Sequence, residues 1–95
     1  MHPIDDILKD LGPAYSIQTI DNERVIYHKI NDCYDIEVSG LDSHKKNPTI
    51  VIYVWQLKPG KQIVERIEGI HTISHLADTL VELRRKYSAS GTLPG

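Results

Sequence analysis

The most constraining feature of the sequence is an unbroken apolar run within TIVIYVWQL, residues 49–57. A strand with one buried face alternates apolar and polar residues, because successive side chains point to opposite sides. In this run both sets are apolar, with Ile50, Ile52 and Val54 on one side and Val51, Tyr53 and Trp55 on the other. The strand therefore needs cover on both sides, and a chain of 95 residues has few elements to supply it.

The composition is that of a single globular domain, with 40% hydrophobic and 25% charged residues. A chain this short buries about 60–65% of its unfolded surface, so an interface with a partner would add stability. The single cysteine, Cys33, excludes an internal disulfide and a cysteine-rich zinc site. We find no signal segment and no apolar stretch of the ~20 residues that a membrane span needs, so we expect a cytoplasmic protein.

Hydrophobic periodicity and turn residues divide the chain into helices and strands. We expect helices over residues 2–12 and 72–87, and strands over residues 14–20, 24–30, 33–39, 49–57 and 62–70. Short connections predict an α+β fold: an antiparallel β-meander of four or five strands, a long C-terminal helix packed on one face and a short N-terminal helix. The domain should span residues 1–87, with a flexible C-terminal tail over residues 88–95.

The dipeptide Asn31-Asp32 predicts a two-residue hairpin loop between the second and third strands. Such a loop places His28 directly opposite Asp35 on the side of the hairpin away from the core. The core side of this hairpin is then expected to comprise Val25, Tyr27, Tyr34, Ile36 and Val38.

The ionisable side chains do not predict an enzyme. Cys33 shares a side with His28 and Asp35, and these residue types can form a nucleophilic set. An exposed sheet face lacks the pocket and the oxyanion donors for that chemistry, so we expect an ordinary His28–Asp35 ion pair. His71 and His75 are four residues apart, but no glutamate follows His71, and we expect two surface histidines. We expect no catalytic residue, no metal, no cofactor and no small-molecule substrate.

The Pro59-Gly60 turn predicts a hairpin between the fourth and fifth strands. In that hairpin Tyr53 lies opposite Arg66, and Trp55 lies opposite Val64. One face of the pair is aliphatic apart from a single charged residue, and comprises Ile50, Ile52, Val54, Ile63, Glu65 and Ile67. It matches a stripe on the C-terminal helix formed by Leu76, Leu80 and Leu83.

The other face of this hairpin mixes aromatic side chains with charge. Aromatic residues and arginine are enriched at the centres of protein interfaces. The candidate partner-binding residues are therefore Tyr53, Trp55, Val64 and Arg66. Two elements could cover this face. One is the N-terminal helix, in a three-layer monomer, and the other is a second chain.

The net charge of −2 is unevenly distributed, because residues 1–42 are acidic and residues 43–95 are basic. One explanation is attraction between the two halves, within one fold or between copies. The other is a basic surface for nucleic acid, with candidate contacts at His44, Lys45, Lys46, Lys58 and Lys61.

The function expected from these features is that of a small protein-interaction domain, an adaptor or accessory protein. It should bind a protein partner or self-associate as a homodimer through the aromatic sheet face. The alternative is a nucleic-acid-binding accessory protein that uses the same face and the basic loops.

Overall fold

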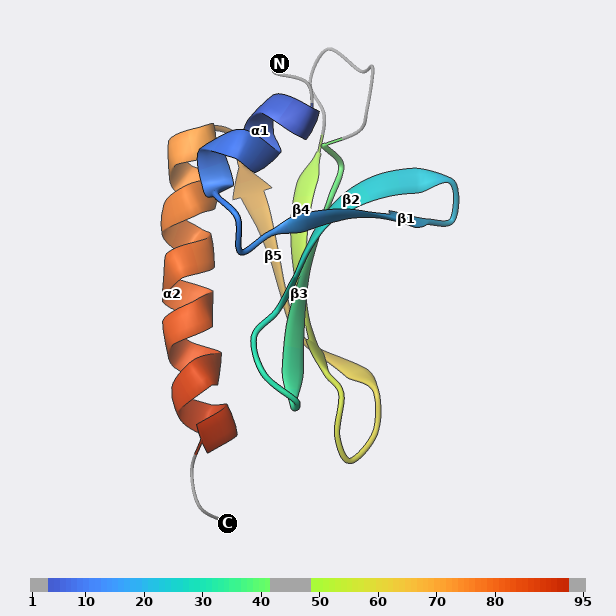
Figure 1. Cartoon of the computed structure of the whole chain (residues 1–95), viewed down its shortest axis with the longest axis vertical. Coiled ribbons are helices and arrows are strands. Elements are labelled where there is room, and N and C mark those ends of the chain that lie inside the picture. Colours follow the sequence, from blue (N-terminus) through green and yellow to red (C-terminus); the bar gives the residue numbers. More distant parts are fainter. Residues whose placement is uncertain (1–3, 42–48, 93–95) are drawn as a thin grey trace.

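The structure is a computed structural model that describes residues 4–41 and 49–92, with side chains up to Ser88. Its elements are α1 (Ile4–Leu11), β1 (Ser16–Ile20), β2 (Glu23–Lys29), β3 (Tyr34–Ser39), β4 (Ile50–Gln56), β5 (Gln62–Ile70) and α2 (Ile73–Thr92). The strands form one antiparallel sheet in the order β1-β2-β3-β4-β5 (Figure 1). The predicted α+β fold is confirmed, with five strands in the meander.

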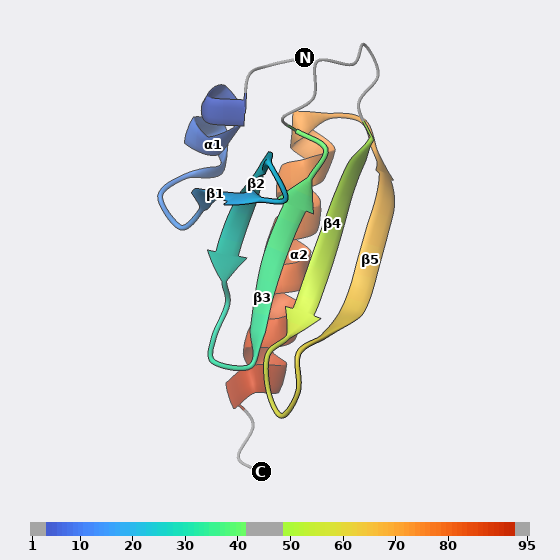
Figure 2. The ribbon, with the colours of Figure 1, turned by 90° about the vertical axis from the view of Figure 1, so that its right-hand side faces the viewer.

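Helix α2 covers one face of the sheet, behind β3 and β4 in Figure 2. Its predicted stripe of Leu76, Leu80 and Leu83 is buried in the main hydrophobic core. The sheet contributes side chains from alternate positions of its strands, including Ile26, Ile36, Val38, Ile52 and Val54. The core forms because apolar side chains recur about every 3.6 residues along the helix and at every second residue along the strands, which gives each element one apolar face.

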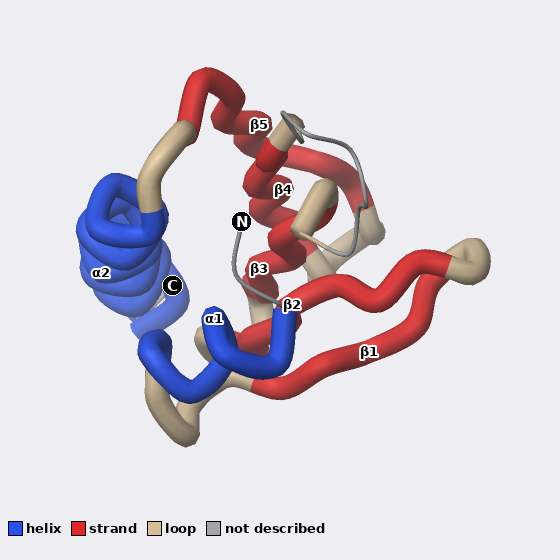
Figure 3. The backbone as a smooth tube through the Cα atoms, turned by 90° about the horizontal axis from the view of Figure 1, so that it is seen from above, coloured by secondary structure: helices blue, strands red, loops and turns tan. Residues whose placement is uncertain are grey.

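Helix α1 lies on the same side of the sheet as α2, as Figure 3 shows from above. Its buried residues Ile4 and Ile7 belong to the same core as Leu76 and Leu80. The N-terminal helix therefore does not cover the aromatic face, and the arrangement that places it there is wrong. The apolar side of α1 nevertheless faces this core, because Leu8 and Leu11 are partly buried against it.

Helix α2 begins where Thr72 caps it. The Thr72 hydroxyl accepts a hydrogen bond from the His75 backbone N–H at 3.0 Å, as an N-cap residue does. His71 precedes the helix, and both His71 and His75 are exposed, as expected. The helix continues to Thr92, past the boundary expected at Tyr87, while residues 93–95 of the expected tail lie outside the described ranges.

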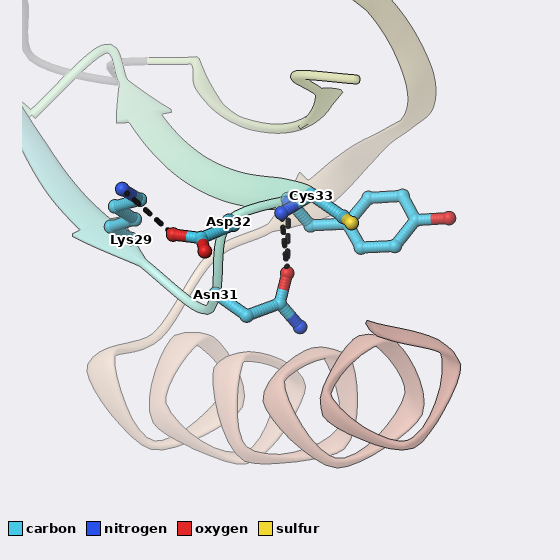
Figure 4. A network of polar contacts seen from close by, with 5 residues as sticks. Lys29, Asn31, Asp32 and Cys33 are labelled. Carbon is cyan, nitrogen blue, oxygen red and sulfur yellow. Dashed lines mark hydrogen bonds and ion pairs between the residues drawn. The ribbon is translucent and has the colours of Figure 1, made fainter. Parts of the chain in front are cut away.

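Four residues, 30–33, separate β2 from β3, and the Ile30 N–H donates to the Tyr34 carbonyl, so the loop closed by this pair comprises residues 31–33 and not the predicted two. Figure 4 shows Asn31, Asp32 and Cys33 in this loop. The Asn31 side-chain oxygen accepts hydrogen bonds from the backbone N–H groups of Cys33, at 2.8 Å, and Tyr34, at 3.0 Å. The Asn31 amide nitrogen donates to the Tyr87 carbonyl at 3.2 Å, which ties the loop to α2. An asparagine whose side chain accepts hydrogen bonds from the backbone of its own loop stabilises a longer turn than the dipeptide Asn31-Asp32 predicts.

The extra loop residue shifts the β2–β3 register by one position and turns β2 over relative to the prediction. The observed pairs are Lys29 with Asp35, His28 with Ile36 and Tyr27 with Glu37. The predicted His28–Asp35 pair is wrong, because the two side chains lie on opposite faces. His28 instead faces the helices, where its Nδ1 lies 2.8 Å from the Ala14 carbonyl oxygen and its ring packs on Tyr15. Val25 and Tyr27 therefore lie on the face opposite Ile36 and Val38, not beside them as predicted, although Val25 is buried there with an exposed fraction of 1%.

The predicted β4–β5 register is confirmed at the centre of the hairpin. Tyr53 pairs with Arg66, and Val54 pairs with Glu65. Near the turn the register steps to Trp55 opposite Ile63, so the predicted Trp55–Val64 pair is wrong. This irregularity leaves Val64 without a partner in the ladder and turns Ile63 away from α2.

Glu65 is the one charged residue on the aliphatic face of this hairpin. Its Oε1 accepts hydrogen bonds from the Tyr87 hydroxyl at 2.5 Å and from the Lys86 ammonium at 3.0 Å. The hydrogen bond from Tyr87, helped by Lys86, holds the pKa of the Glu65 carboxyl below its usual range despite partial burial. The carboxylate therefore joins the end of α2 to the sheet instead of interrupting the core.

Candidate functional site

The sheet face away from α2, called the open face below, carries two rows of contrasting side chains. The paired residues of one row run across the sheet in the order Lys29, Asp35, Trp55 and Ile63. Those of the next row are Tyr27, Glu37, Tyr53 and Arg66. Acidic side chains from the middle strand thus lie beside the aromatic side chains of β4.

The β1–β2 hairpin leaves the sheet on the side away from α2, as Figures 1 and 3 show. Its tip is a two-residue turn in which Asp21 and Asn22 have φ angles of 51° and 66°. Two positive φ angles are those of a type I′ turn, which Asp and Asn tolerate better than other non-glycine residues. The hairpin therefore has a defined end that lies over the open face.

A cavity of about 280 Å³ lies between this hairpin and the open face. The hairpin contributes Ile20, Asp21, Glu23 and Val25 to its lining. The other strands contribute Glu37, Ser39, Tyr53, Trp55 and Ile63. The lining is thus aromatic and aliphatic with three carboxylates, in a volume close to the lower end of small-ligand pockets.

Asp35 is the most buried charged residue of the open face, with an exposed fraction of 7%. The Tyr27 hydroxyl donates a hydrogen bond to its carboxylate, but the Oδ1 atom has no hydrogen-bond partner among the described residues. Burial raises the pKa of the Asp35 carboxyl, against the hydrogen bond from Tyr27 and the charges of Lys61 and Lys29. Burial and the neighbouring Asp35 raise the pKa of Tyr27 to about 12.

Glu37 lies two residues further along β3 on the same face. Burial raises the pKa of its carboxyl, and the charges of Asp35 and Glu23 raise it further. Lys61 and a hydrogen bond from Trp55 oppose this shift. Since the indole N–H is the only polar group of Trp55, this bond orients the ring against the acidic centre of the face.

Two cations lie over the aromatic rings of β4. The Lys61 ammonium is 5.1 Å from the centre of the Trp55 ring, and the Arg66 guanidinium carbon is 5.8 Å from the centre of the Tyr53 ring. The Arg66 contact is a cation–π pair, which follows from the predicted position of Arg66 opposite Tyr53. Arg66 also forms an ion pair with Glu68 at 2.8 Å.

The structure brings together three of the four predicted partner-binding residues. Tyr53, Trp55 and Arg66 share the open face, and Val64 lies at the irregularity beside Ile63. Of the candidate nucleic-acid contacts, Lys58 and Lys61 lie in the exposed β4–β5 turn, whereas residues 44–46 (His44, Lys45 and Lys46) lie outside the described ranges.

Sequence reasoning missed the acidic part of the site and the wall formed by the β1–β2 hairpin. The signal for the acids was present, because Asp35 and Glu37 alternate with Ile36 and Val38 in β3. The predicted β2–β3 loop was one residue too short, and this error concealed the signal. It placed His28, in place of Tyr27, on the same face as Asp35 and Glu37.

Comparisons with protein-family models, with curated protein sequences and with solved structures found no match to this chain. Among the side chains that the structure describes, no group of three or more His, Cys, Asp or Glu residues is arranged to hold a metal ion. Within the same ranges, no helix has the length and apolar character to cross a membrane.

The raised pKa values of Asp35 and Glu37 predict how the free energy of unfolding depends on pH. Between the unfolded values, about 4, and the folded values, the folded state holds more protons than the unfolded chain. The contribution of Asp35 and Glu37 is therefore fully present below the unfolded pKa and lost as the pH rises through the folded pKa. Glu65 has the opposite sign, but its lowered pKa confines its effect to more acidic pH.

We therefore expect the free energy of unfolding to rise as the pH falls from neutral, through the raised folded pKa values, towards the unfolded pKa of about 4. Urea unfolding followed by circular dichroism at several pH values measures it. Asp35→Asn keeps an acceptor for the Tyr27 hydroxyl and should make this dependence shallower. An identical pH dependence in wild type and variant would contradict the role given to Asp35.

Proposed function

We propose that this chain is a small protein-interaction domain, without catalytic chemistry of its own, that self-associates through the open face. The observation that carries the proposal is the cavity together with the exposed apolar side chains around it. Among the described residues, the large hydrophobic side chains that are exposed are Ile20, Ile63, Val64 and Val81. The first two line the cavity and the third adjoins it, whereas Val81 lies on α2.

This clustering supports an interface because scattered apolar side chains need no explanation, whereas a group around aromatic residues does. The exposed fractions of Ile20, Ile63 and Val64 are 37%, 46% and 38%. Ile20 and Ile63 line the cavity together with Tyr53 and Trp55, and Val64 follows Ile63 in β5. Tyrosine and tryptophan are among the residue types that supply most of the binding energy at interfaces. A second chain on this face would remove all of these side chains from water.

Charge favours a protein over a nucleic acid as the partner on this face. Glu23, Glu37 and Asp21 line the cavity, and Asp35 lies directly opposite Trp55 in the sheet. Nucleic-acid affinity comes largely from neutralised phosphates, and carboxylates at the centre of a surface repel them. The nucleic-acid alternative would therefore depend on cations beyond this centre.

Dilution of the protein should separate the proposed dimer and shift the emission of Trp55 to the red. Trp55 is the only tryptophan, and it belongs to the proposed interface. Trp55→Thr, which introduces a β-branched residue of high strand propensity, should weaken self-association by about 2 kcal/mol or more, as expected for a tryptophan at the centre of an interface. Sedimentation velocity over a concentration series measures the association.

The matched control is Val81→Thr, which replaces an exposed apolar side chain on α2. It should leave the association unchanged, because α2 covers the opposite face of the sheet (Figure 2). A wild-type protein that sediments as a monomer at high concentration, with emission unchanged on dilution, would refute self-association through the open face.

A further inference from the structure

We propose that the cavity of the open face takes a lysine or arginine side chain from a partner protein. This inference rests on the proposed function, because it takes the same open face as an interaction surface, and this partner protein competes with a second copy of the chain for that face. The cavity combines three carboxylates with the rings of Tyr53 and Trp55. Carboxylates attract a cation by its charge, and an aromatic ring face attracts it through the negative potential of its π electrons. The lining contains no basic side chain.

Asp35 provides an independent reason for a cation at this place. It is more than nine-tenths buried, it lies directly opposite Trp55 in the sheet, and its Oδ1 has no hydrogen-bond partner among the described residues. A buried carboxylate oxygen without a donor destabilises the fold. Asp35 does not line the cavity, but it is the neighbour of Trp55 in the sheet, so a cation held beside Trp55 would reduce that cost through its charge.

Lys61 shows that the surface accepts an ammonium group. Its Nζ lies 5.1 Å from the centre of the Trp55 ring, and its charge acts on both Asp35 and Glu37. Lys61 is exposed at the end of the β4–β5 turn, so its long side chain can leave the ring at little cost. Lys61 is therefore an intramolecular competitor for the cation of the partner.

The apolar rim indicates that the cation belongs to a protein segment and not to a small free amine. Ile20 and Ile63 are exposed in the lining of the cavity, the exposed Val64 follows Ile63 in β5, and none of the three side chains offers a polar group to a hydrated ammonium ion. Apolar side chains that flank a lysine or arginine would cover them and add hydrophobic binding energy. The partner segment thus carries its cation between apolar residues.

The test is a titration of ¹⁵N-labelled protein, followed by the single indole N–H signal of Trp55. The probes are the peptides Ac-Leu-Lys-Leu-NH₂ and Ac-Leu-norleucine-Leu-NH₂, and n-butylammonium ion. The protein is kept at a concentration at which sedimentation gives the monomer. We expect the lysine peptide to bind at least about tenfold more tightly than the norleucine peptide, which lacks only the charge. It should also bind at least about tenfold more tightly than the free amine, which lacks the apolar contacts.

Two variants locate the binding in the cavity. Glu37→Gln retains an acceptor for the Trp55 indole and should weaken the lysine peptide about tenfold. Lys61→Gln removes the competitor and should strengthen the peptide about threefold. Lys58→Gln is its matched control, since it removes an equal charge from the same exposed turn, and it should have no comparable effect.

The outcomes separate this inference from the proposed function. Equal affinity for the lysine and norleucine peptides would overturn the cation site, but it would be compatible with an apolar docking face and so with the proposed function. Equal affinity for the lysine peptide and n-butylammonium would overturn the partner protein as the source. An absence of indole shifts with every probe would also overturn the inference, while sedimentation still decides self-association separately. Equal effects of Lys58→Gln and Lys61→Gln would show a response to net charge and refute the competitor.

Discussion

Leu80→Ala should lower the free energy of unfolding by about 2–4 kcal/mol, through lost transfer energy and the cavity that remains. Leu80 lies between Leu76 and Leu83 in the buried stripe of α2, and its exposed fraction is 1%. Isoleucines and valines of the sheet surround it, and β-branched side chains have few rotamers with which to fill the space. Urea unfolding followed by circular dichroism at neutral pH measures the loss.

The adjacent residue provides a matched control for this substitution. Val81 follows Leu80 on the same helix, but it faces away from the sheet, with an exposed fraction of 47%. Val81→Ala should change the free energy of unfolding by less than about 0.5 kcal/mol. A Leu80→Ala loss as small as that of Val81→Ala would mean that the helix packs on the sheet by another face.

The helices and strands were predictable because their signals are local. The leucine stripe of α2 repeats at the helical period, and α2 presents it to the sheet as expected. The Pro59-Gly60 turn likewise predicted the central pairs of the β4–β5 hairpin, Tyr53 with Arg66 and Val54 with Glu65. Local pattern and tertiary packing agree in these elements.

The β2–β3 register depended on contacts that sequence pattern does not reveal. Asn31 holds the loop through its own side chain and reaches the Tyr87 carbonyl, far away in the sequence. Because the side-chain period of a strand is two, this single extra loop residue exchanged the faces of β2. His28 moved to the helix side, and Tyr27 moved to the open face beside Asp35.

This exchange explains why only the aromatic half of the candidate site was predicted. Tyr53, Trp55 and Arg66 belong to the hairpin whose central register was correct. The acidic half depends on β3 and on the β1–β2 hairpin, which leaves the sheet on the side of the open face in Figure 1. The site is thus a product of two hairpins, and an accurate view of either one alone does not reveal the cavity between them.

Gly40→Ala should be among the most destabilising substitutions in the chain, with a loss of about 3 kcal/mol or more from backbone strain and steric overlap. Gly40 has a φ of +86°, and a Cβ there would lie 1.8 Å from the Thr49 carbonyl oxygen and 2.7 Å from its carbonyl carbon. Backbone atoms cannot yield as the end of a flexible side chain can, so the neighbouring segment would have to move. Urea unfolding measures the loss.

Gly69→Ala is the control that separates strain from overlap. Gly69 has a similar φ of +78°, but a Cβ at that position would meet no atom within 4 Å. Gly69→Ala should therefore lower the free energy of unfolding only through the strain of a positive φ at a residue with a Cβ, by about 1–2 kcal/mol. Equal losses for the two variants would show that the chain accommodates the Cβ of residue 40 without cost.

The Gly40 N–H also donates to the Glu23 carboxylate at 2.7 Å, so movement at Gly40 should displace a wall of the cavity and shift the indole signal of Trp55. Gly69→Ala should leave that signal in place, because Gly69 is not part of the cavity lining.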